Sequence, residues 1–144
     1  MMKEVVIVGG ARTAIGNFNG ALESFNPVDL GVIALKGALD KSGVAADAIQ
    51  EVIAGHCNQA SAPGNSARHI ALKAGCPVES GAFTVHQQCA SSMRAAELLS
   101  QQILMGKLPT GAVLRIARMP NTPYFRSGAR KGYRLGNAEQ VVDG

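Results

Sequence analysis

The fold of this chain is decided by residues 82–105, AFTVHQQCASSMRAAELLSQQILM, where a strand pattern runs directly into a helix pattern. Residues 82–85 are apolar and partly β-branched, and they predict a buried strand. Residues 90–105 predict the strongest helix of the chain, which Gly106 would end. We expect the apolar face of this helix to consist of Met93, Ala96, Leu99 and Ile103.

The same alternation extends in both directions along the chain. Strands are predicted at residues 5–8, 51–54 and 111–114, and helices at residues 26–43 and 65–74. In the first of these helices Asn26 suits the N-cap and Pro27 the first helical position, and Gly43 is a suitable end. The sequence therefore predicts an α/β fold, with a mainly parallel sheet of βαβ units covered by helices.

Composition limits what this protein can be. The 144 residues are 47% hydrophobic and 17% charged, with three cysteines and no tryptophan, which fits a globular domain. No apolar run approaches the ~20 residues that a membrane helix needs, and the start of the chain lacks a signal-peptide pattern. We therefore expect no membrane association, reduced cysteines and a cytoplasmic location.

The net positive charge of the chain comes from its last third. Residues 1–99 carry a net charge of −1 and residues 100–144 a net charge of +5. Such a basic segment can bind phosphates of a nucleotide-like cofactor or of nucleic acid, or it can be a solvated surface. Because no nucleic-acid-binding motif accompanies it, nucleic acid is not an expected partner.

Cys89 lies where the predicted strand turns into the predicted helix. Free N–H groups and the positive end of the helix dipole at such a position favour a thiolate over a thiol. The small residues 90–92 would let another molecule approach the sulfur, and the Cys89 N–H could help to hold an oxyanion. Cys89 is therefore a candidate nucleophile, and the alternative is a buried, inert cysteine.

Residues 83–95, FTVHQQCASSMRA, resemble the nucleophile segment of the thiolase family, which comprises acetyl-CoA acetyltransferases and 3-ketoacyl-CoA thiolases. Further segments match the family in the same order: the opening strand and loop at 5–16, the GNSAR motif at 64–68, and the start of the loop domain at 129–136. Ala14 stands in the opening loop where proline is usual. The resemblance implies one half of a thiolase-like sheet-and-helix fold.

By this resemblance, Cys89 takes the acyl group from an acyl-CoA thioester. Coenzyme A would leave, and a second acyl-CoA, deprotonated next to its carbonyl, would attack the acyl-enzyme. In the reverse direction a 3-ketoacyl-CoA is cleaved. The resemblance thus implies an acyl-CoA C-acyltransferase of fatty acid metabolism, with coenzyme A thioesters as substrates and no covalently bound cofactor.

The other catalytic groups of the family are an Asn in an Asn-Glu-Ala-Phe-like motif, a His in Gly-His-Pro and a Cys in Cys-x-Gly-Gly-Gly. None of these motifs occurs in residues 1–144, so the chain resembles only the N-terminal part of a thiolase. We expect residues 1–119 to form the half-sheet domain and residues 120–144 to begin a truncated loop domain. We expect that a polypeptide of residues 1–144 alone does not complete a catalytic turnover. The alternative function is a non-catalytic remnant that self-associates or binds a partner.

No nearby histidine is expected to replace the missing groups. His86 lies three residues before Cys89, and along a strand this odd spacing points the two side chains to opposite faces. His69 lies in a different predicted helix. His86 is therefore interpreted as a structural residue at the end of a strand.

The remaining cysteines are interpreted as structural. Cys57 follows His56 directly, so these two side chains face apart on an extended chain, and Cys76 follows the helix at 65–74. Because no Cys-x-x-Cys or His-x-x-x-His spacing occurs, no metal site is expected.

Two arginines conflict with the predicted strand at 111–114. Arg115 and Arg118 would enter a buried strand end, where an unpaired charge is costly. We therefore expect that the strand stops by Leu114 or that this segment is rebuilt.

The family also implies a partner. In thiolases two halves pack through their central helices, and here the helix at 90–105 would expose Leu98, Leu99 or Ile103. Exposed apolar surface of this kind favours association. We expect a homo-oligomer or a complementing thiolase half.

Overall fold

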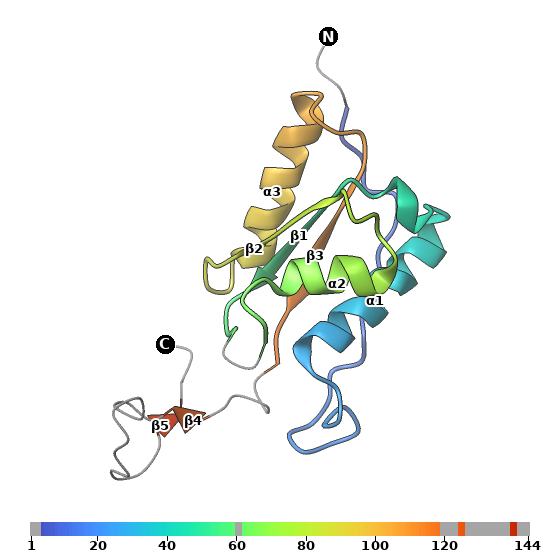
Figure 1. Ribbon diagram of the computed structural model, residues 1–144. Helices are drawn as coiled ribbons and strands as arrows, with labels where there is room; N and C mark the ends of the chain where they lie inside the picture. Colours follow the sequence, from blue (N-terminus) through green and yellow to red (C-terminus); the bar gives the residue numbers. More distant parts are fainter. Residues whose placement is uncertain (1–3, 60–61, 119–123, 126–138, 141–144) are drawn as a thin grey trace.

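The computed structural model describes residues 4–59, 62–118, 124–125 and 139–140, and Figure 1 shows their arrangement. In chain order the elements are α1 (Pro27–Ser42), the 3-10 helix η1 (Ala46–Ala48), β1 (Glu51–His56), α2 (Ser66–Ala74), β2 (Gly81–Val85), α3 (Ser91–Leu104), β3 (Gly111–Ile116), β4 (Tyr124–Phe125) and β5 (Glu139–Gln140). All three predicted helices and three of the four predicted strands are confirmed, with ends that differ by at most two residues.

Strands β1, β2 and β3 form one parallel sheet in the order β2-β1-β3. Ala54 of β1 lies beside Thr84 of β2 on one side and Leu114 of β3 on the other. Figure 1 shows α3 on one face of this sheet and α1 with α2 on the other. The α/β fold class and the βαβ units expected from the sequence are thereby confirmed. Because the strands are parallel, the segments that follow β1 and β2 meet at one edge of the sheet.

Short-range contacts determine both ends of α1. The Asn26 side chain accepts the N–H of Asp29 at 2.9 Å, and the Asp29 carboxylate accepts the N–H of Asn26 at 3.5 Å. Pro27 is the first helical residue, and Gly43 ends the helix with φ 68°. All of these groups lie within a few residues of one another, which is why the sequence alone predicts the two ends.

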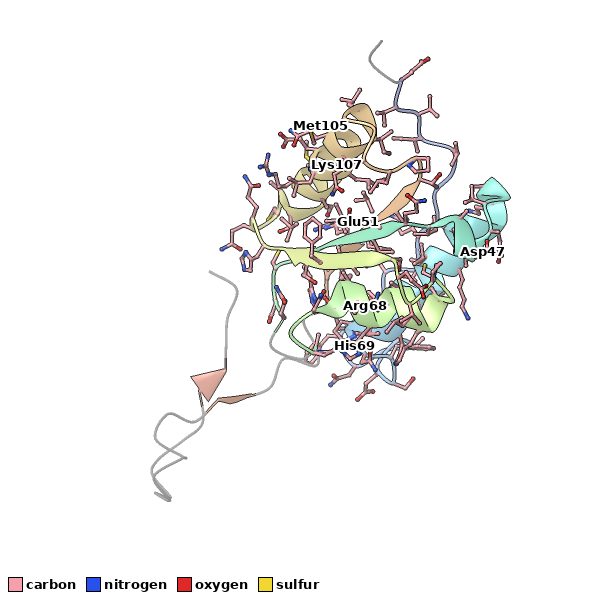
Figure 2. The ribbon with its side chains drawn as sticks, turned by 45° about the horizontal axis from the view of Figure 1, so that its top comes forward. Asp47, Glu51, Arg68, His69, Met105 and Lys107 are labelled. Carbon is pink, nitrogen blue, oxygen red and sulfur yellow. The ribbon has the colours of Figure 1, made fainter. Side chains whose placement is uncertain are left out.

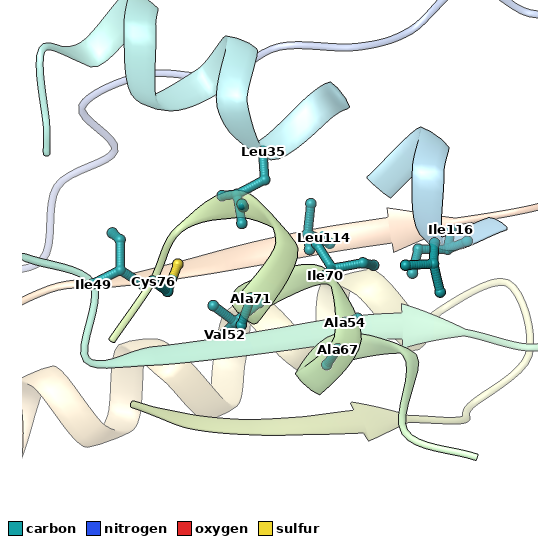
Figure 3. Close-up of a cluster of buried hydrophobic side chains, with 12 residues drawn as sticks. Leu35, Ile49, Val52, Ala54, Ala67, Ile70, Ala71, Cys76, Leu114 and Ile116 are labelled. Atoms are coloured by element: carbon teal, nitrogen blue, oxygen red, sulfur yellow. The ribbon is translucent and has the colours of Figure 1, made fainter. Parts of the chain in front are cut away.

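The larger hydrophobic core lies between the sheet and the pair α1–α2 (Figure 3). Leu35 of α1, Ile70 of α2 and Val52 of β1 are at most 2% exposed. The two helices pack closely, since a Cβ on Gly31 of α1 would lie 2.9 Å from Ile70 Cγ1. This face of the sheet therefore carries most of the apolar burial that stabilises the fold.

The smaller core lies between the sheet and α3, and it corrects the predicted face of this helix. Ala95 and Leu99 are buried against Ile53 of β1, whereas Met93 is 77% exposed and Ala96 is also exposed. The apolar pattern alone misplaced the buried face because the first buried residue of α3, Ser91, is polar.

The apolar residues expected to be exposed on α3 are also corrected. Leu99 is buried, and Leu98 and Ile103 pack against the same core. Apolar exposure on this helix and at its end falls instead on Met93, Leu104 and Met105. Figure 2 places Met105 and Lys107 beyond the last turn of α3.

Residues 5–8 do not form the predicted strand, and this prediction is wrong. Val6, Ile7 and Val8 are 65%, 96% and 63% exposed. A strand requires a neighbour that pairs with its N–H and C=O groups, and no neighbour pairs with this segment in the described parts of the chain. A β-branched run by itself therefore did not suffice to form a strand.

Strand β3 continues past Leu114 to Ile116, so the expected early stop is also wrong. Arg115 points to solvent. Arg118 is only 7% exposed, but it is paired: Nε donates to the carbonyl of Phe25 at 2.8 Å and Nη2 to that of Glu23 at 2.9 Å. These hydrogen bonds to the loop before α1 remove the cost of burying an unpaired charge, which was the reason to expect that the strand stops by Leu114.

Most of the expected loop-domain segment at 120–144, and the boundary at 119/120, lie outside the described residues. Within it, Tyr124 and Phe125 of β4 pair antiparallel with Gln140 and Glu139 of β5.

Candidate functional site

Cys89 lies in the turn that joins β2 to α3, as the sequence predicts. Its side chain is exposed, and it precedes Ser91, the first residue of α3, by two positions. The N-cap residue Ala90 makes no side-chain hydrogen bond to the helix. The positive end of the α3 dipole lies beside Cys89, so this end of the helix can stabilise negative charge next to the sulfur.

The backbone of this turn is strained at the residue before Cys89. Gln88 has φ 49°, in the left-handed region, which costs a residue with a Cβ about 1–2 kcal/mol. Two backbone hydrogen bonds close the turn, from Ala90 N to Gln87 O and from Ser91 N to Gln88 O, each at 3.1 Å. The turn therefore presents Cys89 in one defined conformation.

Ser91 holds the same turn through its side chain. Its hydroxyl accepts the N–H of Gln87 at 2.8 Å and donates to the carbonyl of Gln88 at 2.6 Å. Ser91 is only 2% exposed, so these bonds are shielded from water. The sequence indicates only a small residue at position 91 and does not reveal this role.

Gly55 of β1 allows the start of α3 to lie directly against the sheet. A Cβ on Gly55 would lie 2.6 Å from the carbonyl carbon of Ser91 and 2.7 Å from Ser92 Cα. Both are backbone atoms, which cannot turn away as a flexible side chain can. The absence of a side chain at Gly55 therefore sets the position of the helix start and of the turn that carries Cys89.

A second thiol lies beside this turn. Cys57, which follows β1, donates from Sγ to the carbonyl of Gln88 at 2.7 Å, and its sulfur is 3.5 Å from the Ser91 hydroxyl. From the sequence, Cys57 is interpreted only as a structural residue. The signal that could have revealed the proximity is that Cys57 and Cys89 follow the carboxyl ends of two paired parallel strands.

His56 points to the opposite face of the sheet, as the sequence predicts. It is fully buried, and its Nδ1 lies 3.0 Å from the hydroxyl of Ser66 on α2. Its Nε2 has no hydrogen-bond partner among the described residues. Burial lowers the pKa of His56, and positive charge on His86 acts in the same direction. His56 is therefore a neutral residue of the α1–α2 face.

The GNSAR motif at 64–68 braces β2 against α2. The Asn65 side chain caps α2 by accepting the N–H of Arg68 at 3.3 Å, and it donates to the carbonyl of Ala82 at 3.0 Å. Arg68 donates to the carbonyls of Val78 and Ser80, each at 2.7 Å. The motif thus fixes the strand that leads to Cys89 and makes no contact with its sulfur in the described structure.

Neither His86 nor His69 is placed to activate Cys89. The Nδ1 atom of His86 accepts the N–H of Gln88 at 3.5 Å. His69 is exposed on α2, and Figures 1 and 2 show α2 across the sheet from α3. Within the described residues, no hydrogen bond joins either histidine to Cys89.

Two surface depressions of about 540 and 530 Å³ lie away from Cys89. The first is formed by the end of α1, the following loop and Ala74 of α2, and the second by residues 20–24. In the described part of the chain, no three His, Cys, Asp or Glu side chains gather as a metal site would require. None of the helices described is long and apolar enough to cross a membrane.

Comparison with known proteins identifies relatives of this chain. The family described as thiolase, N-terminal domain, matches residues 5–143. The acetyl-CoA acetyltransferase of Cupriavidus necator is 35% identical over 147 aligned positions, which cover 99% of this chain and 37% of that protein. A probable acetyl-CoA acetyltransferase of Escherichia coli is 39% identical and covers 99% and 36%. The chain thus spans little more than a third of the length of these relatives.

Solved structures show the same similarity in three dimensions. The acetyl-CoA acetyltransferase of Syntrophomonas wolfei superposes with a TM-score of 0.88 and 39% identity, over 97% of this chain and 35% of that one. The Acat5 thiolase of Ascaris suum, solved in complex with coenzyme A, gives a TM-score of 0.89 and 30% identity, over 96% and 36%.

Proposed function

The chain belongs to the thiolase family, and from this membership we propose that Cys89 is the nucleophile of an acyl-CoA C-acyltransferase reaction. The observation that carries the proposal is an exposed cysteine in a strained turn, two residues before a helix. A coenzyme A thioester is the proposed substrate. The relatives named acetyl-CoA acetyltransferase, and the Ascaris suum thiolase in complex with coenzyme A, support this substrate class.

The proposed reaction has two half-reactions. In the first, the Cys89 sulfur attacks the thioester carbonyl, a new carbon–sulfur bond forms, and coenzyme A leaves as its thiolate. The positive end of the α3 dipole supports this step because it can stabilise the oxyanion of the tetrahedral intermediate. In the second, the carbanion of another acyl-CoA attacks the acyl-cysteine, and Cys89 is released.

We propose that the groups that activate Cys89 and move the proton of the second substrate come from outside residues 1–144. The printed sequence has no Gly-His-Pro, Cys-x-Gly-Gly-Gly or Asn-Glu-Ala-Phe motif. No hydrogen bond joins His86 or His69 to Cys89 among the described residues. A polypeptide of residues 1–144 alone is therefore expected to perform the first half-reaction slowly and not to complete a turnover.

The alternative function is that of a folded domain that binds a partner, either a second copy or a complementing thiolase half. One observation favours it: Val6, Ile7 and Val8 form a β-branched run that is more than 60% exposed at each position. Met93 and Met105 add exposed apolar surface on and after α3. Patches of this kind mark surfaces that are covered in an assembly.

Acyl transfer is tested by incubating the protein with acetyl-CoA and measuring its intact mass. We expect one acetyl adduct, which is lost in Cys89→Ala and retained in Cys76→Ala, because Cys76 is buried. Alkylation with iodoacetamide gives a second readout, in which Cys89 should react before Cys57 and Cys76. If no adduct forms, or if Cys89→Ala retains it, the acyl-transfer proposal fails and the partner-binding function is preferred.

A further inference from the structure

We propose that Cys57 and Cys89 form a reversible disulfide when a hydroperoxide oxidises Cys89, so that Cys57 acts as a resolving thiol for the candidate nucleophile. The proposal shares Cys89 with the proposed acyl transfer but uses a different reaction. The two proposals can therefore fail independently of each other.

The distance between the two cysteines supports this bond. Cys57 Sγ lies 2.7 Å from the carbonyl oxygen of Gln88, the residue bonded to Cys89. Since that oxygen lies about 2.8 Å from the next Cα in a trans peptide, Cys57 Sγ is at most about 5.5 Å from Cys89 Cα. In a disulfide the corresponding distance is roughly 3–4.5 Å. The disulfide therefore requires this distance to shorten by up to about 1–2.5 Å, through rotation of the two side chains and movement of the turn.

The turn can accept this shift and keep the hydrogen bonds that Ser91 makes to it. The carbonyl of Gln88 accepts from the Ser91 hydroxyl at 2.6 Å and from the Ser91 N–H at 3.1 Å, besides the thiol of Cys57. When Cys57 turns away, this carbonyl keeps two donors. The exposed side chain of Cys89 is also free of the packing that would hold it in place.

Cys76 is the contrasting thiol. It is buried in the core between the sheet and the pair α1–α2, and burial raises the pKa of its thiol. It precedes β2, whereas Cys57 and Cys89 follow the carboxyl ends of their strands. Cys76 is thus a matched control that we expect to take no part in the reaction.

The proposed oxidation is balanced with a hydroperoxide as the oxidant. The Cys89 thiolate attacks one peroxide oxygen, the O–O bond breaks, and Cys89 becomes a sulfenic acid while hydroxide leaves. The Cys57 sulfur then attacks the Cys89 sulfur, the S–S bond forms and the S–O bond breaks. The departing hydroxide takes the proton of Cys57 as water, and a dithiol reductant restores both thiols.

The experiment treats the reduced protein with a molar excess of hydrogen peroxide, blocks the remaining thiols with N-ethylmaleimide and maps the peptides without reduction. Cleavage after Lys, Arg and Glu separates the three cysteines, because Glu79 lies between Cys76 and Cys89. We expect peptide 52–68 linked to peptide 80–94, with the loss of two hydrogens reversed by dithiothreitol. The linkage should persist in Cys76→Ser and disappear in Cys57→Ser, where Cys89 should proceed to sulfinic acid.

The peptide map of the unmodified protein tests the proposal even if a variant fails to fold. A link from Cys89 to Cys76 or to another molecule, or sulfinic acid at Cys89 without any link, would overturn the proposal. Acetylation measured on the same reduced sample separates the two hypotheses. Failure of acetylation with an intact Cys57–Cys89 link rejects the acyl transfer alone, and acetylation without the link rejects the resolving role alone.

Discussion

The two faces of the sheet differ in what they contain. The face covered by α1 and α2 carries the larger apolar core, and its one buried histidine is bonded to Ser66. The face covered by α3 has a smaller apolar core, and near the helix start it buries hydroxyl groups and backbone. Cys89 and Cys57 both adjoin this second face.

The difference between the two faces separates residues that affect only the stability of the fold from residues that also affect the reactivity of Cys89. On the α1–α2 face, a Cβ added at Gly31 meets the side chain of Ile70 rather than a backbone atom. On the α3 face, the turn that carries Cys89 is held by Ser91 hydrogen bonds and by backbone that touches Gly55. Changes on the α3 face should therefore affect stability and Cys89 together, and changes on the other face should affect stability alone.

The largest effect is expected at the two close-packed glycines. Gly55→Ala places a Cβ against the backbone of Ser91 and Ser92 and should lower the free energy of unfolding by about 3 kcal/mol. The matched change Gly31→Ala meets the side chain of Ile70, and it gains about 1 kcal/mol of helix propensity, so its net effect should stay within about 1 kcal/mol. Urea unfolding measures both, and equal losses would contradict the distinction between the faces.

A smaller effect is expected at Ser91. Ser91→Ala removes the acceptor of the Gln87 N–H and one donor to the Gln88 carbonyl, which should cost about 1–2 kcal/mol. It should also slow acetylation of Cys89, because the turn loses its support. Ser100→Ala is the control on the same helix, since Ser100 donates only to the carbonyl of Glu97. A Ser91 variant with unchanged stability and labelling would show that the turn is held by its backbone alone.

The smallest effect is a dependence of stability on pH at the α1–α2 face. Burial lowers the pKa of His56 below its usual 6.5, so the unfolded chain binds this proton more readily than the folded one. The stability contribution is therefore complete above pH 6.5 and decreases below it, by at most about 1.4 kcal/mol per pH unit.

Unfolding curves of the protein and of His56→Gln between pH 7.5 and 5 measure this dependence, as those pH values bracket the usual histidine range. The His56→Gln variant should lose this pH dependence of the free energy of unfolding. The exposed residue His69 provides the control, because His69→Gln should keep the pH dependence of stability. Unchanged stability of the unmodified protein across this range would reject a buried neutral His56.

The parts of the fold that the sequence predicts are those with local causes. The ends of α1 follow from Asn26, Pro27 and Gly43, and the position of Cys89 follows from a strand that turns into a helix. The buried face of α3 was predicted only in part, since Leu99 and Ile103 pack on the core and Met93 and Ala96 are exposed. Burial of Ser91 was not predicted because it depends on contact with Gly55, far away in sequence. The strand at 5–8 was wrong because strand pairing needs a neighbour that a local pattern does not supply.

The candidate site shows the same division. Its central residue, Cys89, was predicted from the type of residue and its place before a helix. The contacts of Cys57 with Gln88 and Ser91 join positions more than thirty residues apart, so only the register of β1 with β2 reveals them. The pairing of Arg118 with the loop before α1 is a similar case, since it joins positions 93 and 95 residues apart.

The amino-acid sequence by itself determined the α/β class, the order of the helices, and the cysteine in the turn before α3, because capping groups and hydrophobic periodicity act over a few residues. The tertiary structure decided which face of α3 is buried, how the turn is held and which thiol lies beside Cys89. These features arise where parallel strands end at a common edge, and chain segments distant in sequence meet there only after the sheet has formed.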